Sequence, residues 1–174
     1  LMRKAAENMY HPAQLYLGVA YFYGEGVPQD YRQAVYWLNE GIPNSYTPGH
    51  IPLNALYDKA HPADRVYSQT WYRKTAKSVI AKVQYNFGVW YYNGYHLSKD
   101  RHLALEWYRK AAAQGLAEAQ DAIGVMFMQG ESVSQDDQQV LTWYRKAARQ
   151  GLPAAQTHLG IMSAFGRGVV QSDR

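Results

Sequence analysis

The 174-residue chain contains no cysteine, which excludes disulfide bonds, thiolate metal sites and cysteine nucleophiles. It also lacks any apolar run close to the roughly 18 to 20 residues that a membrane-spanning helix needs. Charged residues make up only 18% of the chain and the formal net charge is +4, short of the concentrated basic patch that is typical of nucleic-acid binding. We therefore expect a soluble protein of the cytoplasm or periplasm, and the residues that follow Leu1 carry no signal-peptide features.

Three signals recur along the chain with a period of about 36 residues. The tryptophans lie 34, 36 and 36 residues apart, at Trp37, Trp71, Trp107 and Trp143. A glutamine stands four residues before a glycine at Gln14, Gln84, Gln120 and Gln156. An aspartate precedes each of these tryptophans by seven residues. The agreement of the three periods predicts a chain built from one repeated supersecondary unit.

Each repeat predicts a pair of helices. An aspartate can begin the second helix, because its carboxylate accepts hydrogen bonds from the free amide groups of the first turn. These aspartates are Asp30, Asp64, Asp100 and Asp136. After Asp100, Ala104, Trp107, Tyr108 and Ala111 form one apolar face at helical spacing. We expect Gly41, Gly115 and Gly151 to end these helices in the left-handed conformation. The helix that follows, for example over 117–128, contains a glycine that permits close approach of a partner helix.

Together these residues follow the pattern A-x-x-x-L-G-x-x-Y-x-x-G-x-G-V-P-x-D-x-x-x-A-x-x-W-Y-x-x-A-A-x-x-G, which resembles the Sel-one-like repeat (SLR). The first copy matches it at Ala13, Leu17, Gly18, Tyr21, Gly24, Gly26, Val27, Pro28, Asp30, Ala34 and Trp37. The fourth copy matches it at Gly124, Gly130, Asp136, Trp143, Tyr144, Ala147, Ala148 and Gly151. The family is a bacterial and eukaryotic relative of the tetratricopeptide repeats. The resemblance implies an all-α fold, a right-handed α/α superhelical solenoid of stacked helical hairpins, that acts as a protein-binding scaffold or adaptor.

We expect a single solenoid over residues 1–174. Its copies are predicted at 7–43, 44–79, 80–115 and 116–151, with a partial copy at 152–174 and the end of a preceding copy at 1–6. Both ends are expected to lie within a repeat, so that the chain is a fragment of a longer array or a homo-oligomer that covers its exposed solenoid ends. The second copy departs from the pattern, because Pro52 replaces the helix glycine and turn-forming residues fill 42–60. This segment predicts a shortened first helix and a kink in the superhelix, or else a partner-specific loop.

The resemblance also selects candidate partner-binding residues, because the first helix of each hairpin lines the concave face of tetratricopeptide-like solenoids. In the first copy these residues are Leu15, Val19, Phe22 and Tyr23. In the third copy they are Tyr85, Val89, Tyr92 and Asn93, and in the fourth they are Asp121, Val125, Met128 and Gln129. The apolar members would bury a peptide or helix, while Tyr23, Asn93 and Gln129 would set its register. The alternative is that the apolar members pack against neighbouring helices.

Other functions find less support in the sequence. The six histidines show no metal-ligand spacing, and no nucleophile elbow or phosphate-binding loop occurs, so we predict a non-enzymatic protein without metal or cofactor. The Arg-Lys pairs that recur in the second helices, such as Arg109-Lys110 and Arg145-Lys146, could bind nucleic acid or an acidic partner. Their other interpretation is a solvated outer face, and we expect no nucleic acid as partner. A further alternative is a regulatory or immunity protein that neutralises a toxin or an enzyme.

Overall fold

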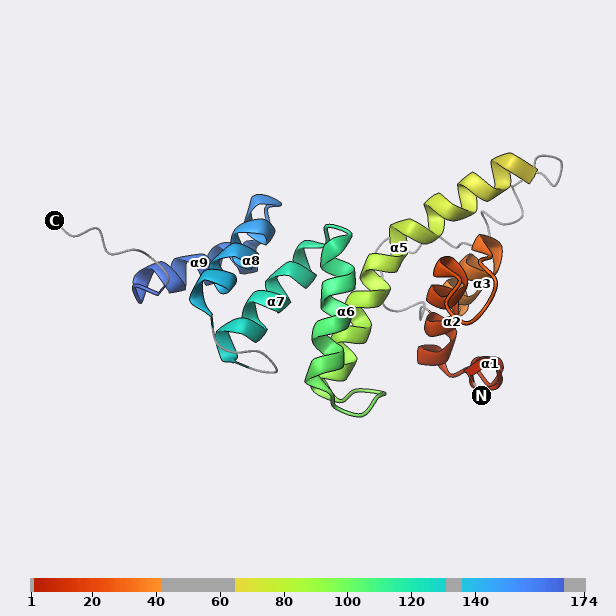
Figure 1. The fold of residues 1–174 in the computed structure, drawn as a ribbon, viewed down its shortest axis with the longest axis horizontal. Coiled ribbons are helices and arrows are strands. Elements are labelled where there is room, and N and C mark those ends of the chain that lie inside the picture. The colour runs from red at the N-terminus through yellow and green to blue at the C-terminus, as the bar shows by residue number, and fades with distance from the viewer. Residues whose placement is uncertain (1, 42–64, 131–135, 168–174) are drawn as a thin grey trace. The chain divides into compact units, whose positions relative to one another are not determined.

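The computed structural model describes residues 2–41, 65–130 and 136–167, and every regular element within these ranges is an α-helix (Figure 1). The helices are α1 (Met2–Glu7), α2 (His11–Tyr23), α3 (Tyr31–Gly41), α5 (Arg65–Asn93), α6 (Arg101–Ala113), α7 (Ala117–Gln129), α8 (Asp137–Arg149) and α9 (Pro153–Ala164). The predicted all-α fold class is confirmed. The irregular segment 42–60, predicted as a kink or a partner-specific loop, lies outside the described residues.

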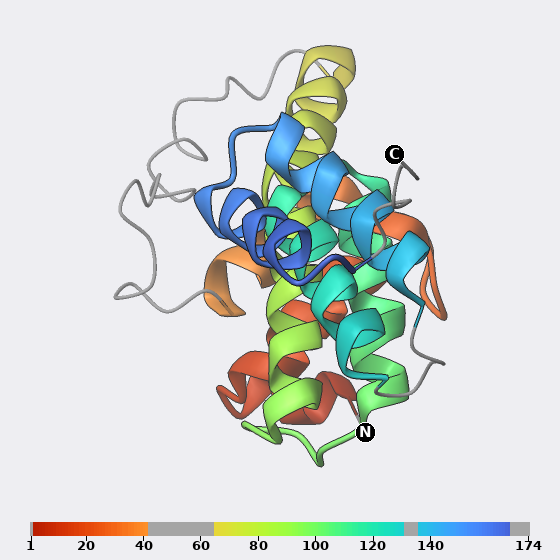
Figure 2. The same ribbon diagram turned by 90° about the vertical axis from the view of Figure 1, so that its left-hand side faces the viewer.

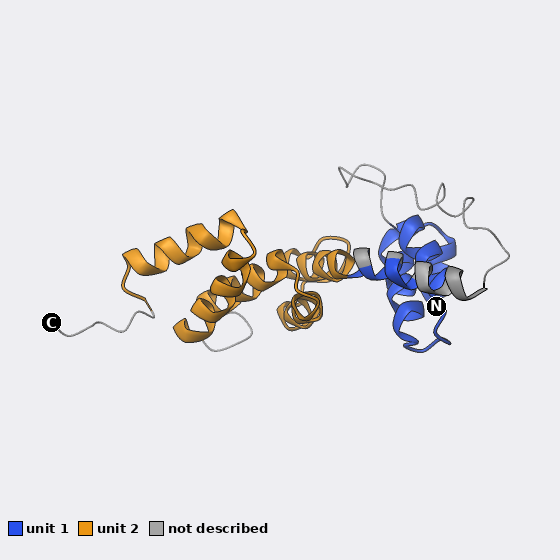
Figure 3. Cartoon of the chain, turned by 90° about the horizontal axis from the view of Figure 1, so that it is seen from above, with its two compact units in different colours: residues 1–80 blue, residues 81–174 orange. Residues whose placement is uncertain are grey.

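The chain divides into two compact units, residues 1–80 and residues 81–174, called unit 1 and unit 2 here (Figure 3). In unit 1, α1 packs on α2, and α2 packs on α3. In unit 2, α6 packs on α7, α7 on α8, and α8 on α9 (Figures 1 and 2). Helices that follow one another in sequence are therefore neighbours in space, as in a solenoid whose repeats contact only their neighbours.

Aspartates begin the second helices of the repeats, as the sequence predicts. The side chain of Asp100 accepts a hydrogen bond from the Leu103 amide at 3.0 Å, and Asp136 accepts one from the Gln139 amide at 3.1 Å. Asp30 accepts from two amides of the first turn of α3 in the same way. Each carboxylate thus satisfies amide groups that have no partner within the helix. The aspartate of the second copy lies outside the described residues.

Glycines end two of these helices, but one predicted end has a different cause. Gly115 and Gly151 have φ angles of +89° and +85°, the left-handed conformation predicted for them. The prediction for Gly41 is wrong, because this residue is the last of α3 and has no positive φ. A Cβ atom at Gly41 would lie 2.7 Å from Cγ of Leu15. Glycine is needed there because α2 and α3 approach each other closely, not because the chain turns.

Helix α5 runs without interruption through the expected boundary between the second and third copies. The position that corresponds to Gly115 and Gly151 is occupied by Val79. A β-branched residue is strongly disfavoured in the left-handed conformation, so the helix has no ending signal there and continues. Residues 65–80 of α5 belong to unit 1 and residues 81–93 to unit 2. The expected break between two helices is therefore absent, while the copy boundaries themselves stay a prediction.

The glycine of each glutamine–glycine signal lies against a large side chain of the following helix. The pairs are Gly18 with Leu38, Gly88 with Tyr108, and Gly124 with Tyr144. In the last pair, a Cβ atom at the glycine would come within 2.5 Å of the tyrosine ring, which is 0% exposed. The residue after the repeat tryptophan therefore fills a notch that only glycine leaves open.

The glutamine of the same signal joins neighbouring repeats. Gln114 Nε2 donates a hydrogen bond to Gln84 Oε1 at 2.5 Å, and Gln150 Nε2 donates to Gln120 Oε1 at 2.9 Å. Both acceptors are buried, and both donors directly follow the last residue of a second helix. A buried amide needs such a partner, which explains why the glutamine keeps the period of the repeat.

Candidate protein-interaction surface

Two of the candidate partner-binding residues belong to the core of unit 1. Leu15 and Val19 are each only 2% exposed. Leu15 lies against Gly41 of α3, where a Cβ atom would meet its side chain. The expectation that these two residues contact a partner is wrong, because the protein itself already covers them.

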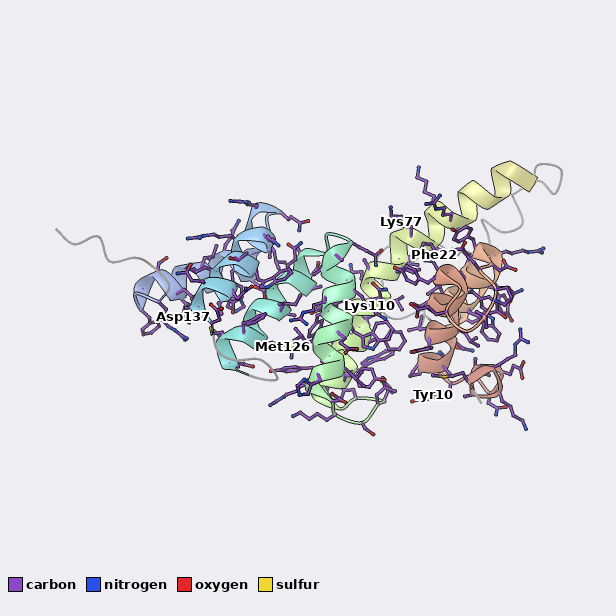
Figure 4. The ribbon with its side chains drawn as sticks, viewed as in Figure 1. Tyr10, Phe22, Lys77, Lys110, Met126 and Asp137 are labelled. Carbon is purple, nitrogen blue, oxygen red and sulfur yellow. The ribbon has the colours of Figure 1, made fainter. Side chains whose placement is uncertain are left out.

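The other two candidates of the first copy lie near the C-terminal end of α2 (Figure 4). The half-buried ring of Phe22 meets the rings of Tyr23 and Tyr31 edge-on, at centroid distances of 5.0 and 5.4 Å. Tyr23 is 43% exposed. These aromatic side chains form a small accessible group on unit 1.

In unit 2, the apolar candidates are half-buried against the helices that follow them. Tyr85, Val89 and Tyr92 of α5 pack against a cluster of buried residues from α6 and α7. Val125 and Met128 of α7 pack against a second cluster from α8 and α9. The alternative interpretation, packing against neighbouring helices, therefore accounts for part of each of these side chains, and only the remainder is open to a partner.

A hydrogen bond joins the candidate residues of neighbouring first helices. The hydroxyl group of Tyr92 on α5 donates to Oε1 of Gln129 on α7 at 2.8 Å. The next residue, Asn93, is exposed and donates from Nδ2 to the carbonyl group of Val89 within its own helix. The ends of α5 and α7 thus present one continuous surface of amides and a phenol above apolar side chains.

The repeat extends this surface to α9, which the sequence reasoning did not include. Ile161 occupies the position of Val89 and Val125, and Phe165 that of Asn93 and Gln129. They are 46% and 76% exposed. The signal that could have found them is the same 36-residue offset, applied to the partial last copy. We call Tyr92, Asn93, Met128, Gln129 and Phe165 the first-helix row.

A polar cluster lies beside this row and connects three helices of unit 2. Nδ1 of His158 on α9 lies 2.8 Å from Oδ1 of Asp121 on α7, and the imidazole ring lies 4.8 Å from the ring of Tyr144. Burial, and then the charge of Asp121, raise the pKa of the Tyr144 phenol, whereas Arg167 lowers it. Asp121, a candidate for partner contact, is thus engaged within the protein.

The lysines of the Arg-Lys pairs fold onto the repeat tryptophans. Nζ of Lys110 lies 4.5 Å from the ring centre of Trp107, and Nζ of Lys146 lies 4.4 Å from that of Trp143. A cation over an aromatic face is attracted to it, and the alkyl stem covers apolar surface. This arrangement agrees with the interpretation of these residues as a solvated outer face.

Two searches of the described ranges bear on other kinds of site. Within them, no group of three or more histidine, aspartate and glutamate side chains is placed to hold a metal ion. None of the helices in the same ranges has both the length and the apolar character needed to cross a membrane.

The geometry defines the class of protein: an α-helical repeat protein whose hairpins are tied together by capping aspartates, helix-packing glycines and paired glutamines. The model of the Sel1 repeat matches residues 11–41, 81–116, 117–152 and 153–174. The chain belongs to the Sel1 repeat family. Sel1 repeats generally form non-catalytic scaffolds that mediate protein interactions. No curated protein matched the chain.

Two solved structures are similar to the chain. The first is a protective antigen with an SLR fold, present in uropathogenic Escherichia coli strains, with 36% identity and a TM-score of 0.52. The match covers 98% of this chain but spans only 37% of the length of the antigen. The second is a Sel1 repeat protein from Oxalobacter formigenes, with 24% identity and a TM-score of 0.47, which covers 91% of this chain and 94% of that protein.

Proposed function

We propose that the chain is a protein-interaction scaffold that holds a segment of a partner against the first-helix row of unit 2. The observation that carries this proposal is the hydrogen bond between Tyr92 and Gln129, because it makes residues of successive repeats parts of one surface. A surface that is already fixed by internal hydrogen bonds loses little conformational freedom when a partner binds.

The composition of the row fits a peptide or helix with apolar side chains. Phe165 is the most exposed large apolar side chain of unit 2, at 76%. Exposed aromatic rings commonly anchor interfaces. Asn93 and Gln129 are exposed amides beside it in the repeat order, and such groups can pair with the polar atoms of a bound segment. The exposed Phe22–Tyr23 group of unit 1 is a second, smaller place where a partner could extend.

A peptide-display selection on the full chain tests this function. Peptides that bind the chain are measured by calorimetry against Phe165→Asp, which places a carboxylate on the row at an exposed position. The matched control is Tyr95→Asp, because Tyr95 is also an exposed aromatic residue of unit 2, at 62%, but lies in the connector before α6.

We expect Phe165→Asp to weaken binding by about tenfold or more, as for an aromatic anchor, while Tyr95→Asp leaves it unchanged. Equal binding by both variants and the unmodified chain would place the partner on another surface. Failure of the library to yield any specific peptide would count against recognition of short segments altogether.

A further inference from the structure

We propose that a second copy of this chain docks head to tail, so that its α1 and α2 follow α9 in the way that α8 and α9 follow α7. The repeat supports this register, because Arg3-Lys4-Ala5-Ala6 corresponds to Arg145-Lys146-Ala147-Ala148. In the same alignment, α2 corresponds to α9, with the glutamine–glycine signal in the same place. The contact of α7 with α8 and α9 within unit 2 is therefore a template for the contact between copies. The proposal does not depend on the first-helix row.

The receiving side is the face of α9 that carries Gly160. In α7, the equivalent Gly124 is covered by the ring of Tyr144. A Cβ atom built at Gly160 would meet nothing within 4 Å, so the same notch is open. Beside it, Ile161 is 46% exposed, whereas the equivalent Val125 is half-buried against α8 and α9. This face of α9 thus has the shape that α7 uses, but without its cover.

The inserted side is the face of α1 that carries Met2. Met2 corresponds to Tyr144 and is 49% exposed, whereas Tyr144 is 0% exposed. Ala5 is half-buried, whereas the corresponding Ala147 is 0% exposed. One side of α1 already packs on α2, as α8 packs on α9. Its other side is the one that fits the notch, and an unbranched methionine side chain adapts readily to such a gap.

A polar contact supports the same register. Gln150 donates to Gln120 within the chain, at 2.9 Å. In the proposed contact, Asn8 of the second copy takes the place of Gln150, and Gln156 takes the place of Gln120. Both residues carry side-chain amides and both are exposed in the single chain. Docking would pair them as a further member of the amide series that links the repeats.

The two faces are different, so the contact is heterologous and each chain carries one half of it at each site. This property gives a direct experiment, sedimentation velocity over the widest concentration range that the full chain tolerates. Gly160→Leu fills the notch on α9, and Met2→Asp places a charge on the inserted face of α1. Both positions are open or half-exposed, so both variants should keep the helical circular dichroism of the unmodified chain. Ala113→Leu adds similar bulk at an exposed position of α6 and serves as the control.

We expect the mean mass of the unmodified chain and of Ala113→Leu to rise with concentration, while each of the other two variants keeps the mass of one chain. An equal mixture of Gly160→Leu and Met2→Asp should then form a dimer and nothing larger. In that dimer, the intact α1 of one variant meets the intact α9 of the other. The proposal is overturned when the unmodified chain keeps the mass of one chain at every concentration. It is equally overturned when Ala113→Leu fails to associate, when either single variant still associates, or when the mixture gives no dimer.

Discussion

The same substitution at two equivalent glycines should have opposite effects on stability. Gly124→Ala and Gly160→Ala each add one methyl group within a first helix, on α7 and α9. Alanine is more favourable than glycine inside a helix by about 1 kcal/mol. At Gly160 nothing lies within 4 Å of the new Cβ atom, so this gain should appear in full.

At Gly124 the new methyl group would overlap the ring of Tyr144, at 2.5 Å from Cε1 and 2.6 Å from Cδ1. The ring cannot move away freely, because it faces the imidazole of His158 at 4.8 Å and its hydroxyl group donates to Sδ of Met128 at 3.7 Å. Overpacking of this kind costs roughly 1–3 kcal/mol, so after the helix gain we expect a net loss of about 1 kcal/mol.

Urea denaturation followed by far-UV circular dichroism measures both changes. It is performed at low protein concentration, so that association through α9 does not contribute. We expect the midpoint to fall for Gly124→Ala and to rise for Gly160→Ala, relative to the unmodified chain. A Gly124→Ala variant as stable as Gly160→Ala would show that the close approach of α7 and Tyr144 is not what requires glycine.

Three further results are expected. Asp136→Ala removes the carboxylate that caps α8 and should lower the free energy of unfolding by about 1 kcal/mol in urea denaturation, whereas Asp136→Asn should keep most of it. Met9, with φ of 60° and 75% exposure, occupies the position of Gly151. Met9→Gly should therefore raise the thermal midpoint, through relief of about 1 kcal/mol of backbone strain. Burial raises the pKa of the Tyr108 and Tyr144 phenols above the usual value near 10, so the folded state favours their neutral forms. This stabilisation is complete below about pH 10 and is lost as the pH rises further, so the urea midpoint should fall in alkali, and less steeply for Tyr144→Phe.

Much of the local structure could be predicted from the sequence, because its causes act over a few residues. Asp100 and Asp136 cap helices through amides in the next turn, and Gly115 and Gly151 turn the chain where a side chain would be strained. The continuity of α5 depends on an equally local signal, the presence of Val79 where other copies have glycine. That difference was readable, but the strong match of the surrounding repeat concealed it.

The candidate surface was less predictable, because periodicity identifies an apolar face without showing what covers it. Val19, Val89 and Val125 hold equivalent positions, yet Val19 is buried in the core while the other two are half-buried. Their exposure depends on the side chains that neighbouring helices supply, and these differ from copy to copy.

The sequence by itself determined the repeat, its period and the family, since each follows from residue types at fixed separations. Tertiary structure alone decided which parts of each repeat remain accessible. It joins Tyr92 to Gln129 across two helices, buries Leu15 against Gly41, and leaves Gly160 uncovered. These outcomes depend on distances of a few ångströms between helices far apart in the sequence, and side-chain packing sets those distances.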